Sequence, residues 1–203
     1  GADIRKRNFE YNSGREELIQ EITNRNHDLT IISKYPYELC KPFLNRLGIG
    51  YKQMEFMRSN ISIWNYIGQI KKLIKILKTI KPDIVLVYEI KTIPSVCIAA
   101  KIAGAPKVCA VVNGSGRLFQ TKNIVGKVLR IMTFPIIKYS LSISERVFFQ
   151  NPDDMQMFIN LGLVKVIKAV TVNGSGVNMI KFMHKKLPEQ CIFLMASRLI
   201  REK

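Results

Sequence analysis

The chain has 203 residues, 47% of them hydrophobic, and its 32 Lys and Arg residues outnumber 15 Asp and Glu residues, for a formal net charge of +17. This length allows one or two domains with a real core, and the hydrophobic fraction excludes a disordered chain. The charge favours an anionic partner such as nucleic acid, anionic lipid or a phosphorylated small molecule; a merely solvated basic surface is the alternative.

The cysteines and the apolar runs exclude further classes of protein. The four cysteines show no Cys-x-x-Cys spacing, so a zinc or thioredoxin-like site is not expected, and they suit a reducing cytoplasm. No apolar run approaches the roughly 20 residues that span a bilayer, and no signal peptide opens the chain. We therefore expect any membrane role to be peripheral.

Short apolar, β-branched runs alternate with helical patterns along the chain. Such alternation predicts βαβ units and a parallel sheet with helices on both faces, a Rossmann-like α/β fold. The predicted strands are Leu29–Ser33, Asp83–Tyr88, Lys107–Val112, Arg146–Gln150, Lys168–Val172 and Cys191–Met195. The predicted helices are Arg15–Asn26, Ser62–Ile80, Thr92–Ala103, Lys122–Ser142 and Pro152–Leu161.

Two of these helices carry particular expectations. In the helix Ser62–Ile80, isoleucines and a leucine recur at helical spacing on one side, and lysines such as Lys71 and Lys75 fall on the other. We expect those lysines to form a solvated outer face. In the helix Lys122–Ser142, Pro135 should break or kink the helix, because proline donates no backbone hydrogen bond.

Polar and glycine residues follow three of the predicted strands. In open parallel sheets, ligands bind beyond the carboxyl ends of the strands. That edge carries Glu89 and Lys91, then Asn113-Gly114-Ser115-Gly116, and then Gln150-Asn151. Glycines let backbone amides approach a ligand closely and favour phosphate oxygens, although two ordinary glycine-rich turns explain the pattern equally well. The third glycine of a dinucleotide-binding motif and the Walker pattern are both missing.

The last residues form a second candidate site. The strand Cys191–Met195 is followed by a turn in which Arg198 and Lys203 lie five residues apart. Two cations at this spacing can bind one diphosphate.

Several segments together resemble the family 4 glycosyltransferases, which are retaining enzymes with the two-domain GT-B fold. The resemblance extends over nearly the whole chain and is closest to the bacterial subgroup that extends lipid-diphosphate-linked sugars. The most distinctive stretches are VFFQNPDD at Val147–Asp154 and MASRLIREK at Met195–Lys203. The others are REELIQEITNRNHDLTIIS from Arg15, the segment Leu47–Arg58 with Asn60, KPDIVLVYEIK from Lys81, VNGSGRLF from Val112 and VNGSGVNMIKF from Val172.

The resemblance implies a function and roles for particular residues. The full-length protein would be a hexosyltransferase that moves a sugar from a nucleotide-sugar donor to a lipid-diphosphate-linked glycan in capsule or O-antigen synthesis, without a metal or other cofactor. Arg198 and Lys203 would bind the donor diphosphate. Lys91 and the loop Asn113–Gly116 would face the acceptor and the transferred sugar, and Arg58 and Asn151 are further candidates for acceptor binding.

Two departures from the family pattern limit what this chain should do alone. The acidic Glu-x7-Glu pair is absent, so the catalytic residues stay unknown, and the usual first strand, expected just before the segment Gly1–Gly14, is missing. We expect residues 1–178 to form the acceptor-side domain and residues 179–203 to begin a truncated donor-binding domain. The isolated chain should then be inactive and should bind nucleotide sugar poorly.

The expected partners are the donor, the lipid-linked acceptor and an anionic membrane surface, but not nucleic acid. The protein is expected in the cytoplasm, peripherally at the inner face of the cell membrane. A non-enzymatic basic module that binds nucleic acid or anionic lipid is the alternative, although no helix-turn-helix, zinc-finger or RNP signature is present. Another GT-B enzyme, such as a nucleotide-sugar epimerase, is a third possibility.

Overall fold

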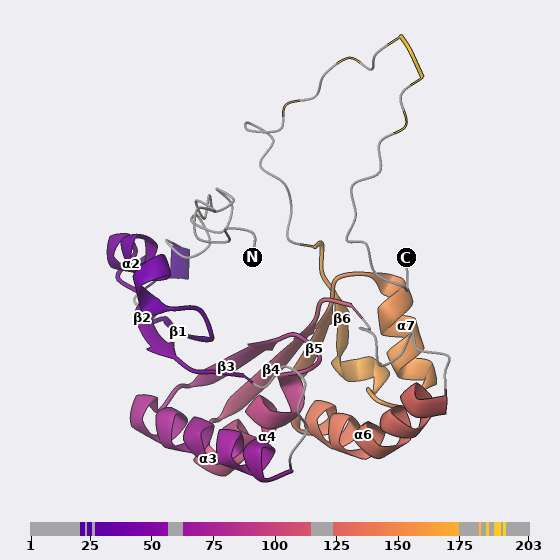
Figure 1. The fold of residues 1–203 in the computed structure, drawn as a ribbon, viewed down its shortest axis with the longest axis horizontal. Helices are drawn as coiled ribbons and strands as arrows, with labels where there is room; N and C mark the ends of the chain where they lie inside the picture. The colour runs from indigo at the N-terminus through magenta and orange to yellow at the C-terminus, as the bar shows by residue number, and fades with distance from the viewer. Residues whose placement is uncertain are drawn as a thin grey trace.

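The computed structural model describes residues 21–22, 24–25, 27–56, 63–114, 124–174, 183, 186, 189–191 and 193. Two parallel sheets lie between layers of helices (Figure 1). The strands are β1 (Thr30–Ser33), β2 (Gly50–Gln53), β3 (Ile84–Tyr88), β4 (Lys107–Val112), β5 (Arg146–Phe149) and β6 (Ala169–Thr171). The helices are α2 (Tyr37–Arg46), α3 (Ile63–Ile80), α4 (Ile93–Ala103), α6 (Ile124–Ile143) and α7 (Pro152–Asn160), with a 3-10 turn at Val166–Lys168.

Every strand pairing in the described part of the chain is parallel. One sheet has the order β1-β2, and the other has the order β3-β4-β5-β6. Each neighbouring pair in the larger sheet is joined by a helix, as the alternation of apolar runs predicts. The predicted α/β architecture is therefore confirmed.

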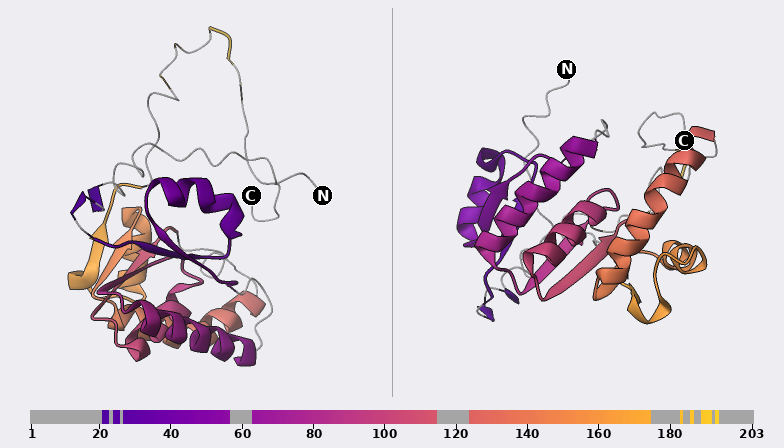
Figure 2. Two further views of the ribbon diagram at one scale, coloured as in Figure 1. Left: turned by 90° about the vertical axis from the view of Figure 1, so that its left-hand side faces the viewer. Right: turned by 90° about the horizontal axis from the view of Figure 1, so that it is seen from below.

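One face of the larger sheet is covered by four helices. Val87, Ala110 and Val147 stand opposite one another across three strands, and all three are buried. They belong to one apolar core with residues of α3, α4 and α6, and with Phe158 of α7. Seen from below, α3, α4 and α6 lie side by side with the short α4 in the middle (Figure 2, right). The same core includes Met54 and contacts Ile32, so the β1-β2 sheet packs against it.

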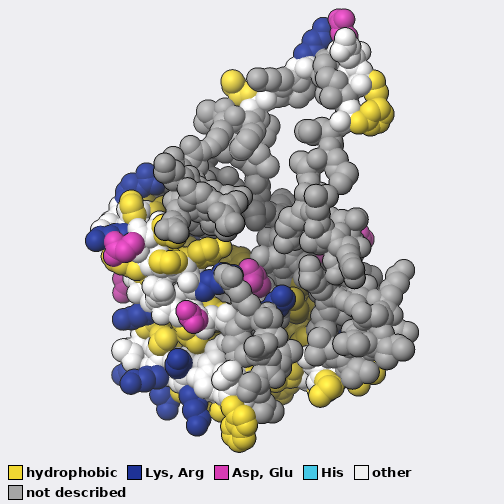
Figure 3. Space-filling view, in the orientation of Figure 1, with side chains coloured by type: hydrophobic (Ala, Val, Ile, Leu, Met, Phe, Trp, Pro, Cys, Tyr) yellow, Lys and Arg dark blue, Asp and Glu magenta, His cyan; other side chains and the backbone are white. Residues whose placement is uncertain are grey.

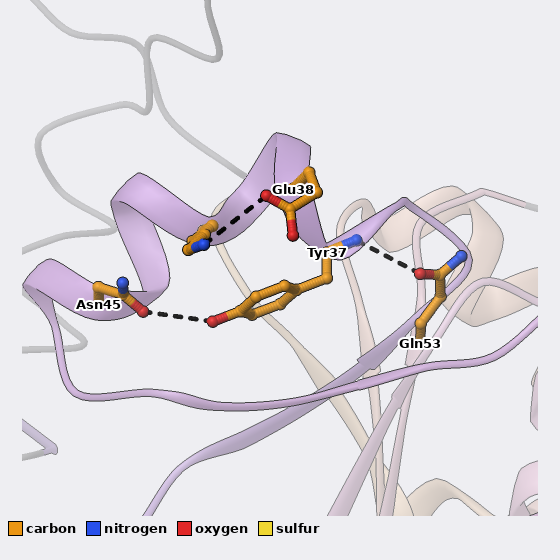
Figure 4. Close-up of polar contacts among 5 residues, drawn as sticks. Tyr37, Glu38, Asn45 and Gln53 are labelled. Carbon is orange, nitrogen blue, oxygen red and sulfur yellow. Dashed lines mark hydrogen bonds and ion pairs between the residues drawn. The ribbon is translucent and has the colours of Figure 1, made fainter.

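The helix α2 covers the other side of β1 and β2 (Figure 1). Its residues Cys40, Phe43 and Leu44 form a second, smaller core. Its first residue is tied to the neighbouring strand, because the backbone N–H of Tyr37 donates to Oε1 of Gln53 at 3.4 Å (Figure 4). The Tyr37 hydroxyl donates to Oδ1 of Asn45, the second-last residue of the helix, at 3.4 Å. Helices thus lie on both faces of the fold, as predicted.

The inner edges of the two sheets are open in the described residues. β1 pairs only with β2, and β3 pairs only with β4. On β3, Val85 and Val87 are buried against the helices, whereas Ile84, Leu86 and Tyr88 on the opposite face are about half exposed. Strands of parallel sheets are normally buried on both faces. Among the described residues, β3 therefore has both a bare apolar face and an open edge.

Some expectations fare differently. Pro135 does not break its helix, since α6 runs from Ile124 through Pro135 to Ile143, and a kink at Pro135 remains a prediction. Pro135 is exposed, so the carbonyl left without a donor can be satisfied by water.

In the predicted strand Cys191–Met195, Cys191 and Phe193 belong to no strand, and the other three residues lie outside the described residues. Most of the predicted helix Arg15–Asn26 also lies outside them. The domain boundary near residue 178 remains a prediction.

The C-terminal end of α6 is held by a lysine from a distant part of the chain. Nζ of Lys168 donates to the carbonyls of Ser142 and Ser144, at 2.6 and 2.8 Å. A cation at this end also interacts favourably with the helix dipole. We expect Lys168→Met to lower the free energy of unfolding by about 1–2 kcal/mol in urea denaturation. Lys165→Met, at an exposed neighbouring position, should change it by less than about 0.5 kcal/mol.

The cysteines should differ sharply in reactivity. Burial raises the pKa of the Cys97 thiol to about 11, against a weaker lowering by its hydrogen bond with Ser144. The thiolate is the reactive form, so at pH 8 only about a thousandth of Cys97 is reactive even before access is considered. Cys191 is exposed. We expect iodoacetamide at pH 8 to modify Cys191 rapidly and to leave Cys97 unmodified, as peptide mass spectrometry would show. Equal labelling of both would contradict the burial of Cys97.

Candidate functional site

The carboxyl ends of β3, β4 and β5 meet at one edge of the sheet, because the three strands are parallel neighbours. The segments that leave these ends are residues 89–92, 113–114 and 150–151, which we call the rim. Each leads toward the N-terminus of a helix: α4, α6 and α7 respectively. Helix N-termini carry partial positive charge and unpaired N–H groups, so they favour anions.

The first segment of the rim is a tight turn with an unusual backbone. Glu89 has a φ of 72°, in the left-handed region that residues other than glycine rarely adopt. Its carbonyl accepts hydrogen bonds from the N–H groups of Thr92 and Ile93 and from the Thr92 hydroxyl, at 3.0, 3.2 and 3.0 Å. The Thr92 hydroxyl also contacts the Tyr88 carbonyl. These contacts hold Glu89 in its strained conformation, and such strain is commonly found at functional sites.

Lys91 lies in the same turn, directly before α4. Its side chain is exposed. The first turn of α4 contains no acidic residue, so neither the helix dipole nor Lys91 is neutralised within this helix. No salt bridge or hydrogen bond of the Lys91 side chain is found among the described residues. The rim therefore presents a positive charge next to a helix N-terminus.

The second and third segments of the rim lie close together. A Cβ atom added to Gly114 would stand 4.0 Å from a carboxylate oxygen of Asp154 in the first turn of α7. Asn151 caps that helix: its Oδ1 accepts from the backbone N–H of Asp154, and its Nδ2 donates to the Asp154 carboxylate, both at 2.7 Å. Both polar ends of the Asn151 side chain are thus engaged in the cap, with Pro152 at the first helical position.

The predicted site residues fall into two groups, those on the rim and those outside the described residues. Lys91, Asn113, Gly114 and Asn151 all lie on the rim, and Asn151 has a clear structural role there; acceptor binding by all four remains a prediction. The site prediction omitted Glu89 of the rim and Asp154, which lies beside the rim in the first turn of α7. The remaining candidates lie outside the described residues: Arg58, Ser115, Gly116, Arg198 and Lys203.

A sequence model described as glycosyl transferase 4-like matches residues 14–151, well over half of the chain and the whole rim. The chain belongs to this family. The predicted resemblance to family 4 glycosyltransferases is thereby confirmed.

One curated relative of this glycosyl transferase 4-like chain is the N,N'-diacetylbacillosaminyl-diphospho-undecaprenol alpha-1,3-N-acetylgalactosaminyltransferase of Campylobacter jejuni. It is 24% identical over 168 residues, which make up 83% of this chain and 44% of the relative. The chain thus spans less than half the length of that enzyme.

Solved structures show the same fold. A glycosyltransferase from Rickettsia africae matches with a TM-score of 0.52 and 17% identity, over 78% of this chain and 38% of its own. A UDP-GlcNAc 2-epimerase from Neisseria meningitidis, bound to UDP-GlcNAc, matches with a TM-score of 0.50 and 18% identity, over 77% and 41%. The MurG protein of Acinetobacter baumannii matches with a TM-score of 0.50 and 11% identity, over 79% and 41%. At these identities the likeness concerns the Rossmann-like GT-B fold alone.

Two further properties of the described residues bear on the site. No group of three or more His, Cys, Asp or Glu side chains in that part of the chain could hold a metal ion. Among the same residues, no helix is both long and apolar enough to cross a bilayer.

Substitutions of Glu89 test the strain at the rim. Glycine adopts the left-handed conformation without steric cost, so Glu89→Gly should leave the free energy of unfolding unchanged or raise it by up to about 1 kcal/mol. Valine is branched at Cβ, so Glu89→Val should lower it by about 1–2 kcal/mol. Urea denaturation of the three proteins measures the order. A Glu89→Val protein as stable as the parent would mean that the turn relaxes and stores no strain.

Proposed function

We propose that the full-length protein is a glycosyltransferase that moves a sugar from a nucleotide-sugar donor to a lipid-diphosphate-linked glycan. Membership of the glycosyl transferase 4-like family supports the reaction class. The name of the Campylobacter relative, which acts on a diphospho-undecaprenol-linked sugar, supports the class of acceptor. The finer assignment, to capsule or O-antigen synthesis, belongs to the same proposal.

The rim is the observation that carries this proposal. A diphosphate-linked acceptor bears negative charge beside its sugar, and the rim offers Lys91 at the N-terminus of a helix with no acid in its first turn. Charge-assisted hydrogen bonds from lysine to phosphate oxygens are among the strong ones in proteins. After the neighbouring strand, Asn113 and Gly114 offer backbone and amide groups that can contact sugar hydroxyls. We assign the acceptor to this edge of the sheet.

We assign donor binding to the last residues of this chain and to the donor-binding domain of the full-length protein. In this proposal Arg198 and Lys203 bind the donor diphosphate and stabilise the charge that grows on the leaving nucleoside diphosphate. No cofactor is required, since the nucleotide sugar is a substrate. The protein acts at the inner face of the cell membrane, where it binds peripherally. We name no nucleophile or base.

Two other functions are separated by specific observations. A nucleotide-sugar epimerase shares the fold, as the Neisseria structure illustrates, but the family match favours the transferases. The net charge of +17 is the one observation that supports a nucleic-acid-binding module.

The decisive experiment is a transfer assay with the full-length protein. A polyprenyl-diphosphate-linked amino sugar is incubated with a set of UDP-sugars, and lipid extracts are analysed by mass spectrometry. The expected result is an acceptor heavier by one sugar residue. Epimerised UDP-sugar with an unchanged acceptor would establish the epimerase instead. The 203-residue chain alone should form no product and should show no micromolar donor affinity in calorimetry.

A further inference from the structure

The three helices α3, α4 and α6 carry cations and no carboxylates. Four lysines lie in α3, one in α4, and two lysines with one arginine in α6, while none of the three helices contains Asp or Glu. The nearest carboxylates in sequence, Asp83, Glu89 and Glu145, belong to the edges of the sheet. Because the helices lie side by side, they form one cationic surface, which we call the helical layer (Figure 2). In Figure 3 the lower part of the molecule, over α3, shows Lys and Arg side chains beside apolar ones.

Large apolar side chains project from the same layer into solvent. Trp64 is 78% exposed in the first turn of α3, and Ile131 and Met132 of α6 are 72% and 74% exposed. Pro135 and Tyr139 continue the exposed stripe of α6 at helical spacing, on the side away from its buried residues. The exposed apolar side chains of α6 form a stripe along one helix, and such a stripe marks an interaction site rather than a merely solvated surface.

We propose that the helical layer is the surface by which the protein binds an anionic lipid bilayer. The cations match the negative surface potential of such a membrane, and Trp, Ile and Met side chains can insert at the boundary between headgroups and acyl chains. A nucleic acid would use only the cations and would leave these apolar side chains in water. The observations therefore favour lipid.

This inference deepens the proposed function and rests on it for its biological purpose. The N-terminal ends of α3, α4 and α6 all lie toward the rim, since each helix follows the carboxyl end of a strand. Trp64 lies in the first turn of its helix, and Ile131 lies in the N-terminal half of α6. A bilayer bound to the helical layer would therefore lie beside the edge of the sheet to which we assign the diphosphate of the acceptor.

Trp64 provides a direct probe, because it is the chain's only tryptophan. Vesicles of equal parts phosphatidylglycerol and phosphatidylcholine, with no acceptor lipid, should shift its emission to shorter wavelength as the ring leaves water. Vesicles of phosphatidylcholine alone should not. Sedimentation with the anionic vesicles should weaken steeply as salt is raised, because exposed charges are screened.

Matched variants separate this surface from general charge and stickiness. Lys71→Gln, Lys78→Gln and Lys101→Gln together should weaken vesicle binding on the order of 100-fold. Removing three exposed lysines elsewhere, with Lys52→Gln, Lys107→Gln and Lys165→Gln, should have a much smaller effect.

The apolar contribution has its own matched pair. Ile131→Ser with Met132→Ser should weaken binding roughly tenfold. Val166→Ser with Ile167→Ser removes two side chains that are 69% and 77% exposed outside the layer, and should change binding little.

Three results would overturn the inference. They are anionic vesicles that bind without a shift in Trp64 emission, control variants that weaken binding as much as the layer variants, and DNA that binds while anionic vesicles do not. None of these experiments needs the donor or the acceptor. Failure of sugar transfer with intact vesicle binding would count against the proposed function alone.

Discussion

Replacing Phe158 with alanine is expected to lower the free energy of unfolding by about 3–5 kcal/mol, the largest stability effect we predict. Phe158 is fully buried in the last turn of α7, and its ring packs against Phe149 of β5 in a T-shaped contact with ring centroids 5.4 Å apart. The substitution removes the ring and leaves a cavity that the rigid sheet cannot fill. Helix α7 has few other buried residues with which to stay attached.

The measurement is urea denaturation followed by circular dichroism, because Trp64 is exposed on a distant helix and reports poorly on this core. Leu161→Ala, at the partly exposed end of the same helix, is the control and should cost below about 1 kcal/mol. A loss under about 1.5 kcal/mol for Phe158→Ala would mean that α7 is not anchored through this ring.

In the full-length protein, Lys91→Ala should impair acceptor use by roughly 10- to 150-fold in kcat/KM, equivalent to about 1.5–3 kcal/mol. The physical reason is the loss of a charge-assisted hydrogen bond to an acceptor phosphate. Donor affinity should change little, because the donor diphosphate is assigned elsewhere. Lys91→Arg should retain much of the activity, since it keeps the charge.

The control for Lys91 is Lys107→Ala. Lys107 is also exposed but begins the neighbouring strand β4, at the end of the sheet opposite the rim. Its substitution should leave the kinetics unchanged. Unchanged acceptor kinetics for Lys91→Ala would make Lys91 an ordinary solvated lysine and would remove the acceptor from this turn.

The strands of the larger sheet could be predicted from the sequence, because strands of a parallel sheet packed against helices are nearly continuous apolar runs. β3, β4 and β5 and the helices between them appear within a few residues of their predicted bounds. The helix α2 was missed, since its ten residues include Pro42 and show no long apolar period. β2 has the sequence GYKQ, which is too polar and short to be predicted from its own pattern, and only the family resemblance of Leu47–Arg58 indicates a strand there. Tertiary pairing decides both elements.

For the site, the sequence predicts the position of the residues but not all of their contacts. Strand–helix alternation puts Lys91, Asn113 and Asn151 at one edge, whatever their side chains do. The engagement of Asn151 with Asp154 was also present in the sequence, as asparagine and proline at the start of a helix. The left-handed backbone of Glu89 could not be predicted, because glycine or asparagine normally occupies that conformation and a glutamate does not indicate it. The conformation is seen only in the structure, where the hydrogen bonds of the turn explain it.

The bare face and open edge of β3 have a practical consequence for anyone who purifies this chain. Unpaired strand edges are templates for pairing with another chain, and in the described part of the chain the free edge of β3 lies beside the exposed Ile84, Leu86 and Tyr88. Two copies can meet there, edge against edge, despite the repulsion of their positive charge. Raising salt to suppress binding to anionic contaminants also screens that repulsion. The yield of monomer should therefore fall as protein and salt concentrations rise together, and charged substitutions at Leu86 are the first remedy to try.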